Sequence, residues 1–132
     1  MKGTEKRALL LFLDKKQKLS LKKDTKTGAE NIMIVDLIRN DLGRISCFGS
    51  VRVKELFKIK TYPTLHQMIS TVRGNLKIDS FYEIIKTLFL CGSVTGAPKI
   101  RTMEIIRELE KEPRNVYTDT TGFIAPYRRL SF

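Results

Sequence analysis

The spacing of apolar residues in the first third of the chain predicts a short strand and a longer helix. The apolar run from Leu9 to Leu13 has the length of a buried strand, although a helix would also fit it. We expect the lysine-rich stretch from Lys15 to Gly28 to be a surface connection. From Glu30 to Leu42 the apolar positions recur at helical spacing, and Gly43 is placed to end that helix.

The middle of the chain predicts two strands separated by a turn. Between Val51 and Ile59 apolar residues alternate with lysines and an arginine, which is typical of a half-buried strand. Tyr62-Pro63-Thr64 is expected to turn the chain. A second strand is predicted from Leu65 to Leu76, and Arg73-Gly74-Asn75 would close it.

Two helices are predicted beyond these strands, each from a recognisable start. Ser80 can cap a helix with Glu83 three residues later, and this helix would run to about Phe89. A loop of small residues is expected from Cys91 to Ala97, and Pro98 would then open the second helix as its first residue.

The second of these helices should end at Pro113 and lead into extended chain from Val116 to Ile124. Its apolar face would be formed by Ile100, Met103, Ile106 and Leu109. The mixture of strands and helices predicts an α+β fold.

The composition is that of a single cytoplasmic domain. At 132 residues and 42% hydrophobic content, the chain can form a core. No apolar run approaches the ~20 residues that span a bilayer and no signal peptide follows Met1, so we expect no membrane partner. Cys47 and Cys91 lie far apart without metal-ligand spacing, which favours free thiols in the cytoplasm.

The formal net charge of +11 raises the question of nucleic-acid binding. A cluster of lysines lies in a stretch that also contains Asp14 and Asp24; its members are Lys15, Lys16, Lys18, Lys22, Lys23 and Lys26. No basic recognition helix and no RNA-binding aromatic signature accompanies them, so we expect a solvated surface and no nucleic-acid partner. A non-catalytic basic binding protein that uses this stretch stays open as an alternative.

Within the helix predicted from Glu30, this first residue is aimed at the interior. At 100° per residue one stripe of the helix contains Glu30, Ile34, Leu37 and Asp41, and the opposite face contains Asp36, Arg39 and Asn40. A buried carboxylate needs a cation, hydrogen bonds or a raised pKa. The alternative is a half-solvated Glu30 stabilised by the helix dipole. A single carboxylate cannot build a metal site without other ligands.

The segment from Gly92 to Lys99 has features of an anion site. Its small residues lead into a helix start, where free backbone N–H groups point outward. Gly92 and Gly96 allow a ligand to approach the backbone closely. Ser93 and Thr95 add hydroxyl donors. The glycine spacing is not that of a nucleotide P-loop, and simple capping of the helix is the alternative.

Lys2 and His66 are weaker candidates. A lysine next to an initiator methionine is normally solvated, and a lone histidine on a strand is usually structural. Spacing alone singles out neither residue.

Two long runs resemble the signatures of chorismate-utilising enzymes. They are residues 30–44 (ENIMIVDLIRNDLGR) and residues 91–106 (CGSVTGAPKIRTMEII). Shorter matches at 49–51, 55–57 and 62–72 lie between them in the order of the family. The resemblance covers nearly the whole chain. It implies part of a chorismate-binding α+β fold, in which antiparallel sheets are flanked by helices.

The sequence is most similar to the aminodeoxychorismate synthase branch of that family. Met1-Lys2-Gly3-Thr4 resembles the Pro-Ile/Met-Lys-Gly-Thr motif of this branch, whereas anthranilate synthases usually carry alanine in place of the lysine. Anthranilate synthases also tend to have threonine in place of Ser93 and serine in place of Thr95. They usually place a second glutamate where this chain has Thr27. A fragment of anthranilate synthase component I is the nearest alternative, and these positions count against it.

The resemblance implies a reaction of chorismate with ammonia, assisted by Mg²⁺, that yields 4-amino-4-deoxychorismate for folate synthesis. Glu30 matches a metal-ligand glutamate, and Lys2 matches the catalytic lysine that adds to the ring. The positions that match substrate-binding residues are Gly3, Thr4, Gly92 and Ser93. A glutamine amidotransferase subunit would supply the ammonia.

Departures from the family pattern concern one histidine and the extent of the domain. The family often has histidine at the position of Gln67, so His66 stays an open candidate for ring chemistry. Leu90 replaces a usual proline. We expect residues 1–132 to form a single partial domain, truncated at both ends, with a non-family tail at 127–132. Such a piece is expected to be inactive by itself.

Overall fold

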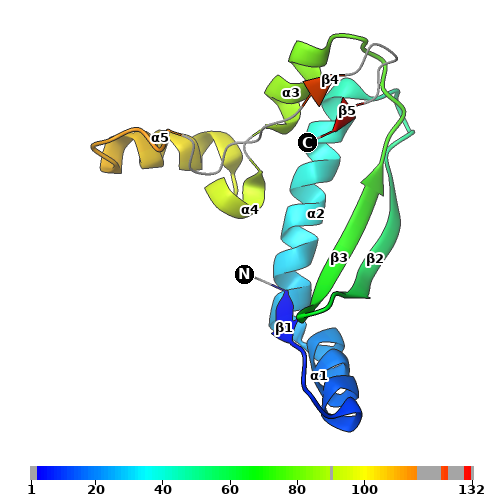
Figure 1. The fold of residues 1–132 in the computed structure, drawn as a ribbon. Helices are drawn as coiled ribbons and strands as arrows, with labels where there is room; N and C mark the ends of the chain where they lie inside the picture. Colours follow the sequence, from blue (N-terminus) through cyan, green and yellow to red (C-terminus); the bar gives the residue numbers. More distant parts are fainter. Residues whose placement is uncertain (1–2, 90, 116–122, 125–129, 132) are drawn as a thin grey trace. The chain divides into compact units, whose positions relative to one another are not determined.

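The computed structural model describes residues 3–89, 91–115, 123–124 and 130–131 (Figure 1). The chain separates into two units, Met1–Phe89 and Leu90–Phe132. Helices occur in both units, and an antiparallel sheet lies in the first. This arrangement confirms the predicted α+β class.

The sheet of the first unit has three antiparallel strands in the described part of the chain, in the order β1-β3-β2. They are β1 (Thr4–Lys6), β2 (Arg52–Thr61) and β3 (Leu65–Arg73). The turn between β2 and β3 is closed by a 2.8 Å hydrogen bond from the Tyr62 N–H to the Leu65 carbonyl. Both predicted strands and the turn at Tyr62-Pro63-Thr64 are therefore confirmed.

The pairing of β2 with β3 is interrupted by bulges. The register shifts between Val53 and Glu55 and again between Glu55 and Lys58. Phe57 lies inside the second shift with a φ of 55°, a left-handed conformation that is uncommon for a bulky residue. Its N–H donates to Ser70 Oγ at 3.1 Å instead of entering the ladder.

Residues predicted to be a strand and a surface connection form a helix instead. Helix α1 spans Leu11–Lys23, so the strand predicted at Leu9–Leu13 is wrong and the connection predicted at Lys15–Gly28 is almost entirely helical. Lysine, glutamine and leucine are good helix formers, which favours helix once the chain is not paired with a sheet. Its first turn begins with the Asp14 N–H, which donates to the Leu10 carbonyl at 2.9 Å.

Helix α2 spans Thr25–Ile45 and extends beyond its predicted bounds at both ends (Figure 1). At the start, the Asp24 side chain caps the helix by accepting from the backbone N–H groups of Lys26 and Thr27. At the end, Gly43 lies inside the helix rather than terminating it. Tertiary contacts carry the helix further, because the Ile45 carbonyl accepts from the Lys77 N–H at 3.0 Å.

Helix α3 (Phe81–Leu88) packs against α2 and confirms the predicted cap. Ser80 Oγ accepts a hydrogen bond from the Glu83 N–H at 3.4 Å. The buried hydrophobic core of the described residues is small and consists of Leu21, Val35, Ile45 and Met68. The first unit is therefore held by a narrow seam between α1, α2 and β3.

The second unit contains α4 (Gly92–Thr95) and α5 (Lys99–Leu109), with β4 (Phe123–Ile124) paired to β5 (Leu130–Ser131). The loop predicted at Cys91–Ala97 thus contains one helical turn. Pro98 is the N-cap of α5 rather than its first residue, and α5 ends at Leu109, before Pro113.

Two predictions for the end of the chain fall partly outside the described residues. These are the extended segment at 116–122 and positions 127–129 and 132 of the expected tail. The predicted apolar face of α5 is partly solvent-exposed, with Ile100 at 67% and Leu109 at 76%, whereas Met103 and Ile106 are half-buried.

Candidate active site

Strand β1 brings the predicted substrate residue Gly3 to the first turns of α2. The Gly3 carbonyl accepts from the Met68 N–H at 2.8 Å. Gly3 has a φ of 68°, and a Cβ atom added there would lie 3.5 Å from Thr27 Cγ2. Because Thr27 lies about one turn before Glu30, Gly3 lies at the same end of α2 as Glu30. Lys2, the predicted nucleophile, lies outside the described residues.

Thr4 has a buried hydroxyl with no hydrogen-bond partner within the described structure. Thr4 lies on β1 opposite Gln67 of β3. Buried polar atoms are nearly always paired in folded proteins, and an exception calls for a ligand, a water or a functional role. The same holds for Gln17 Oε1 and Ser46 Oγ, so the unpaired Thr4 hydroxyl is compatible with a bound ligand or a bound water.

Glu30 is half-buried on α2 rather than fully directed into the core. The buried acid of the same stripe is Asp41, which is 9% exposed. The helix next to Glu30 is fixed by Asn31, whose Oδ1 accepts from Ser70 Oγ at 2.5 Å. Since Ser70 also accepts from the Phe57 N–H, the β2 bulge is connected to this part of α2.

The chemistry of Glu30 suits Mg²⁺, which prefers carboxylate oxygens and often uses only one or two from the protein. In the ranges that the structure describes, no three His, Cys, Asp or Glu side chains gather where they could hold a metal ion. Glu30 could therefore hold Mg²⁺ only together with substrate oxygens, water or further ligands.

Gly92 and Ser93 lie in α4 of the second unit, and their geometry is described within that unit. Gly92 is buried, and its carbonyl accepts from the Gly96 N–H at 2.8 Å. The N–H groups of Val94 and Thr95 both donate to the Cys91 carbonyl. Several amides that were expected to be free for an anion are thus used inside this turn.

Gly96 is the residue that allows the chain to leave α4. Its φ is 111°, and an added Cβ would lie 3.1 Å from Thr102 Cγ2 of α5. The Thr95 hydroxyl, expected as a ligand donor, donates to the Cys91 carbonyl at 3.3 Å. The glycine at position 96 therefore serves close packing of α4 and α5.

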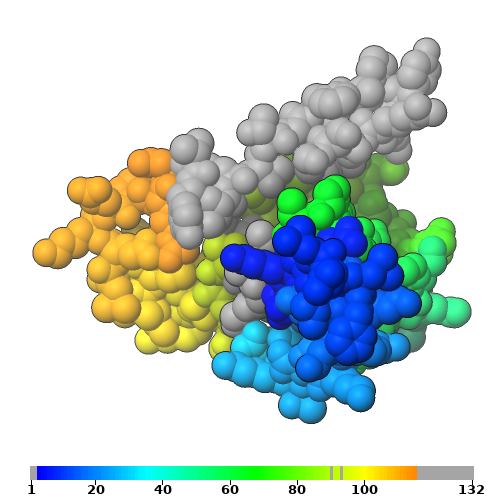
Figure 2. Space-filling model, turned by 60° about the horizontal axis from the view of Figure 1, so that its bottom comes forward, coloured from blue at the N-terminus to red at the C-terminus, as the bar shows by residue number. Residues whose placement is uncertain are grey.

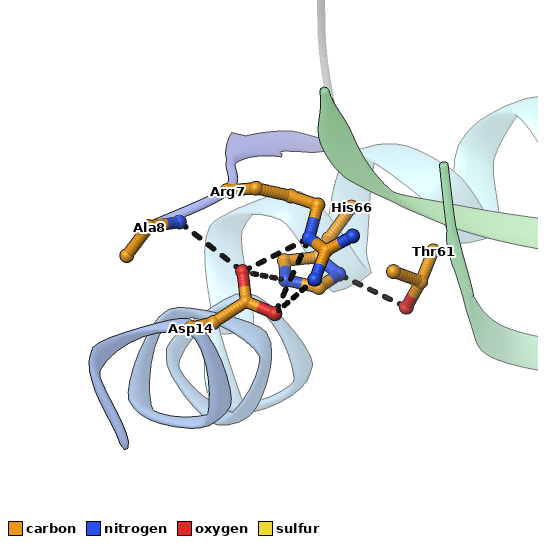
Figure 3. A network of polar contacts seen from close by, with 5 residues as sticks. All are labelled: Arg7, Ala8, Asp14, Thr61 and His66. Carbon is orange, nitrogen blue, oxygen red and sulfur yellow. Dashed lines mark hydrogen bonds and ion pairs between the residues drawn. The ribbon is translucent and has the colours of Figure 1, made fainter. Parts of the chain in front are cut away.

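His66 is buried in β3, at 1% exposure, and both of its ring nitrogens have partners (Figure 3). Nε2 lies 3.0 Å from Asp14 Oδ1, and Nδ1 lies 3.0 Å from Thr61 Oγ1. This environment favours a structural role for His66 over ring chemistry. The contact with Asp14 joins residues 52 positions apart, so no local sequence signal could have revealed it.

Asp14 is the centre of this network. Its carboxylate accepts from Arg7 Nε at 3.2 Å and Nη2 at 3.1 Å, and from the Ala8 N–H at 3.1 Å. The hydrogen bond from Arg7, helped by those from His66 and Ala8, lowers the pKa of Asp14 to about 2 although partial burial opposes this shift. Asp14 is therefore ionised throughout the physiological range.

A groove of about 780 Å³ lies between α1 and β2. Its rim carries Lys15, Lys18 and Lys22, which belong to the exposed lysine cluster on α1. Apolar side chains also line it, namely Leu19, Leu56, Phe57 and Ile59. Figure 2 shows α1, in blue, as an open surface of the first unit, which agrees with the predicted solvated face.

Among the helices that the structure describes, none combines the length and the apolar character that a membrane-spanning segment requires.

The sequence and the α+β fold match one class of protein. The chain belongs to the family of chorismate binding enzymes, whose pattern matches residues 1–132.

Relatives of two specificities are similar to this chain. An aminodeoxychorismate synthase from Streptomyces pristinaespiralis is 48% identical over 126 residues, which are 95% of this chain and 18% of that protein. An anthranilate synthase component 1 from Aquifex aeolicus is 42% identical over 125 residues, which are 93% of this chain and 25% of that protein.

A solved structure supports the same relationship. The crystal structure of anthranilate synthase component I from Streptococcus pneumoniae superposes with a TM-score of 0.74 at 37% identity, over 89% of this chain and 27% of that one. The chain thus spans 18–27% of the length of the three proteins compared.

Proposed function

We propose that this chain forms part of the chorismate pocket of an aminodeoxychorismate synthase, which replaces the ring hydroxyl of chorismate with an amino group. The observation that carries this proposal is the position of β1. It places Gly3, with its positive φ, against Thr27 at the start of α2, about one turn before Glu30. The buried and unpaired hydroxyl of Thr4 lies on the same short strand.

In the proposed reaction, Lys2 is the nucleophile. Its neutral amine adds to the ring, the ring hydroxyl leaves as water, and ammonia then displaces the lysine to give 4-amino-4-deoxychorismate. A lysine that acts near neutral pH needs a lowered pKa, which burial or a neighbouring cation can provide. Bound Mg²⁺ would supply positive charge beside the substrate carboxylate.

The remaining site residues would bind and orient the substrate. Glu30 would hold Mg²⁺ through its carboxylate. The backbone of Gly3 and Gly92 and the hydroxyls of Thr4 and Ser93 would contact chorismate. We propose further that a glutamine amidotransferase subunit provides the ammonia, and that the product enters folate synthesis in the cytoplasm.

Anthranilate synthase is the second candidate, because its relatives are similar to this chain at nearly the same level. Three positions favour the first candidate, namely Lys2, Thr27 and Ser93. The structure makes Thr27 the most informative of them, since its methyl group lies against Gly3. A glutamate there would add a negative charge beside β1.

A replacement experiment tests the proposal. Residues 1–126 of this chain take the place of the matching segment in the Streptomyces pristinaespiralis relative, and the resulting full-length enzyme is supplied with chorismate, ammonium and Mg²⁺. We expect aminodeoxychorismate as the product. Lys2→Ala should reduce its formation by about a thousandfold, because the covalent step is lost. Glu30→Gln should cost more than the roughly 10–100-fold that follows loss of an outer-shell metal partner.

Asp36→Asn provides the matched control, because Asp36 is an exposed acid on α2 that pairs with Arg39. This variant should keep the activity of the parent enzyme. Anthranilate as the main product, or an unchanged Mg²⁺ requirement in the folded Glu30→Gln variant, would contradict the proposal.

A further inference from the structure

Strand β1 is held in place by few backbone contacts. It has three residues, lies at one edge of the sheet and pairs only with β3 in the described structure. The hydrogen bonds at its two ends are 2.8 Å from the Met68 N–H to the Gly3 carbonyl and 3.2 Å from the Arg7 N–H to the Thr64 carbonyl. So short an edge strand needs side-chain contacts to keep one position.

We infer that Asp14 is a positioning residue for the proposed reaction, and that it fixes β1 on β3 so that Gly3 and Thr4 keep their places beside α2 and β3. The inference rests on the proposed function. The partners of the Asp14 carboxylate are Arg7, Ala8 and His66, so Asp14 acts through the strand and not on the substrate.

The geometry shows how one carboxylate fixes the strand (Figure 3). Arg7 and Ala8 directly follow β1, and both donate to Asp14 of α1. His66 lies on β3 opposite Glu5 of β1, and its Nε2 lies 3.0 Å from the same carboxylate. Asp14 thus connects the exit of β1, the start of α1 and the partner strand at one point.

The burial of the network makes this connection rigid. His66 is 1% exposed and the Asp14 side chain 13%, so water cannot easily replace either partner. Hydrogen bonds to an ionised carboxylate are stronger than those between neutral groups, and the forked contact with Arg7 also fixes orientation. The other nitrogen of His66 is held by Thr61 at the end of β2, so the network reaches all three strands.

Loss of the Asp14 charge should loosen β1 without unfolding the β2–β3 pair. Groups of an active site must stay within roughly 0.5 Å of their productive positions, so a strand that shifts should lower kcat/KM for chorismate. Asp14→Asn is the most direct variant, since the amide has the same shape but cannot accept from three donors at full strength.

The first measurement is amide hydrogen exchange on the complete 132-residue chain. In Asp14→Asn the amides of Arg7 and Met68 should exchange about tenfold faster than in the parent, because they report on the two ends of β1. The Tyr62 amide, which closes the β2–β3 turn, should change less than twofold. Asp36→Asn, with the same change of charge at an exposed site, should leave all three unchanged.

The second measurement uses the full-length enzyme that carries this segment. Asp14→Asn should lower kcat/KM for chorismate about tenfold, because the proposed site residues at β1 lose their positions. Asp14→Glu should recover part of the loss, since it restores the charge but not the length. The rates are compared at equal amounts of folded enzyme, where a residue needed only for global stability would not lower kcat/KM.

Two outcomes would overturn the inference. One is unchanged exchange of the Arg7 and Met68 amides in a folded Asp14→Asn protein, and the other is equal acceleration of the Tyr62 amide. If Asp14→Asn does not fold, Arg7→Gln decides in its place, because it removes only the forked contact. The exchange result does not depend on chorismate, so an inactive parent enzyme would count against the proposed function alone.

Discussion

At the scale of single residues, the most informative contact is the one between Asp14 and His66. A lone histidine on a strand offers several interpretations, and here its surroundings favour one. Both ring nitrogens are occupied and the side chain is buried, which leaves no open position for a substrate. Thr4 shows the opposite situation, because its buried hydroxyl has no partner in the described structure. Burial alone therefore does not separate a structural polar side chain from a ligand-binding one. The hydrogen-bond partners of the side chain must also be known.

The lowered pKa of Asp14 predicts a specific dependence of stability on pH. The pKa falls from an ordinary 3.8 to about 2 on folding, so the unfolded chain binds the proton more readily. The stabilisation from ionised Asp14 is therefore complete above pH 3.8 and is lost as the pH falls through about 2. Urea unfolding between pH 5 and pH 2 should show a shallower loss of stability in Asp14→Asn than in the parent.

Asp36 again provides the control for this experiment, since its ion pair with Arg39 is exposed to solvent. Asp36→Asn should keep the pH dependence of the parent chain. Identical slopes for Asp14→Asn and the parent would show that Asp14 is not held as the structure describes.

At the scale of elements, glycines report where helices and strands pack closely. Gly43 lies inside α2 and Gly74 directly follows β3, and their surroundings differ. A Cβ at Gly74 would lie 2.6 Å from Ser46 Oγ and 3.3 Å from Val51 Cγ2, whereas a Cβ at Gly43 would meet nothing within 4 Å. The end of β3 is therefore pressed against the end of α2, and the outer surface of α2 is open.

This difference predicts opposite effects of the same substitution. Gly74→Ala should destabilise the chain by about 1–3 kcal/mol, because the methyl group would crowd Ser46 and Val51. Gly43→Ala should stabilise it by about 0.5–1 kcal/mol, because alanine favours an exposed helix interior. Chemical denaturation of both variants at neutral pH measures the two values. A neutral Gly74→Ala would contradict the close approach of β3 and α2.

At the scale of the whole molecule, the described core is small for the number of large apolar residues. Only four hydrophobic residues are buried in the part that the structure describes, while Leu9, Phe12 and Leu109 are at least 75% exposed. Leu9 and Phe12 lie in the first unit and Leu109 in the second, so each unit exposes large apolar side chains. The proposed catalytic groups would thus depend on contacts that the described units do not themselves make.

The 132-residue chain should therefore be weakly cooperative in solution. We expect a broad thermal transition, strong binding of an apolar fluorescent dye, and no measurable turnover of chorismate with ammonia and Mg²⁺. Chorismate with Mg²⁺ should shift the transition by less than about 1 °C, since ligand stabilisation follows affinity. A sharp transition that chorismate raises by several degrees would contradict this prediction.

The sequence by itself determined the elements whose signals are local. The alternation from Val51 to Ile59 predicts a half-buried strand, and Ser80 with Glu83 predicts a helix cap. Each of these patterns depends only on residues that are close in the chain. The family was recognisable for the same reason, since its signatures at 30–44 and 91–106 are continuous runs.

Only the tertiary structure decided the elements that depend on distant partners. The apolar run from Leu9 to Leu13 has no periodicity that distinguishes a strand from a helix. Asp14 lies in the first turn of α1, where it contacts Arg7 and His66. The end of α2 passes Gly43 because Ile45 is buried and its carbonyl accepts from Lys77. Local patterns cannot record such contacts, because their free energy depends on which segments the topology brings together.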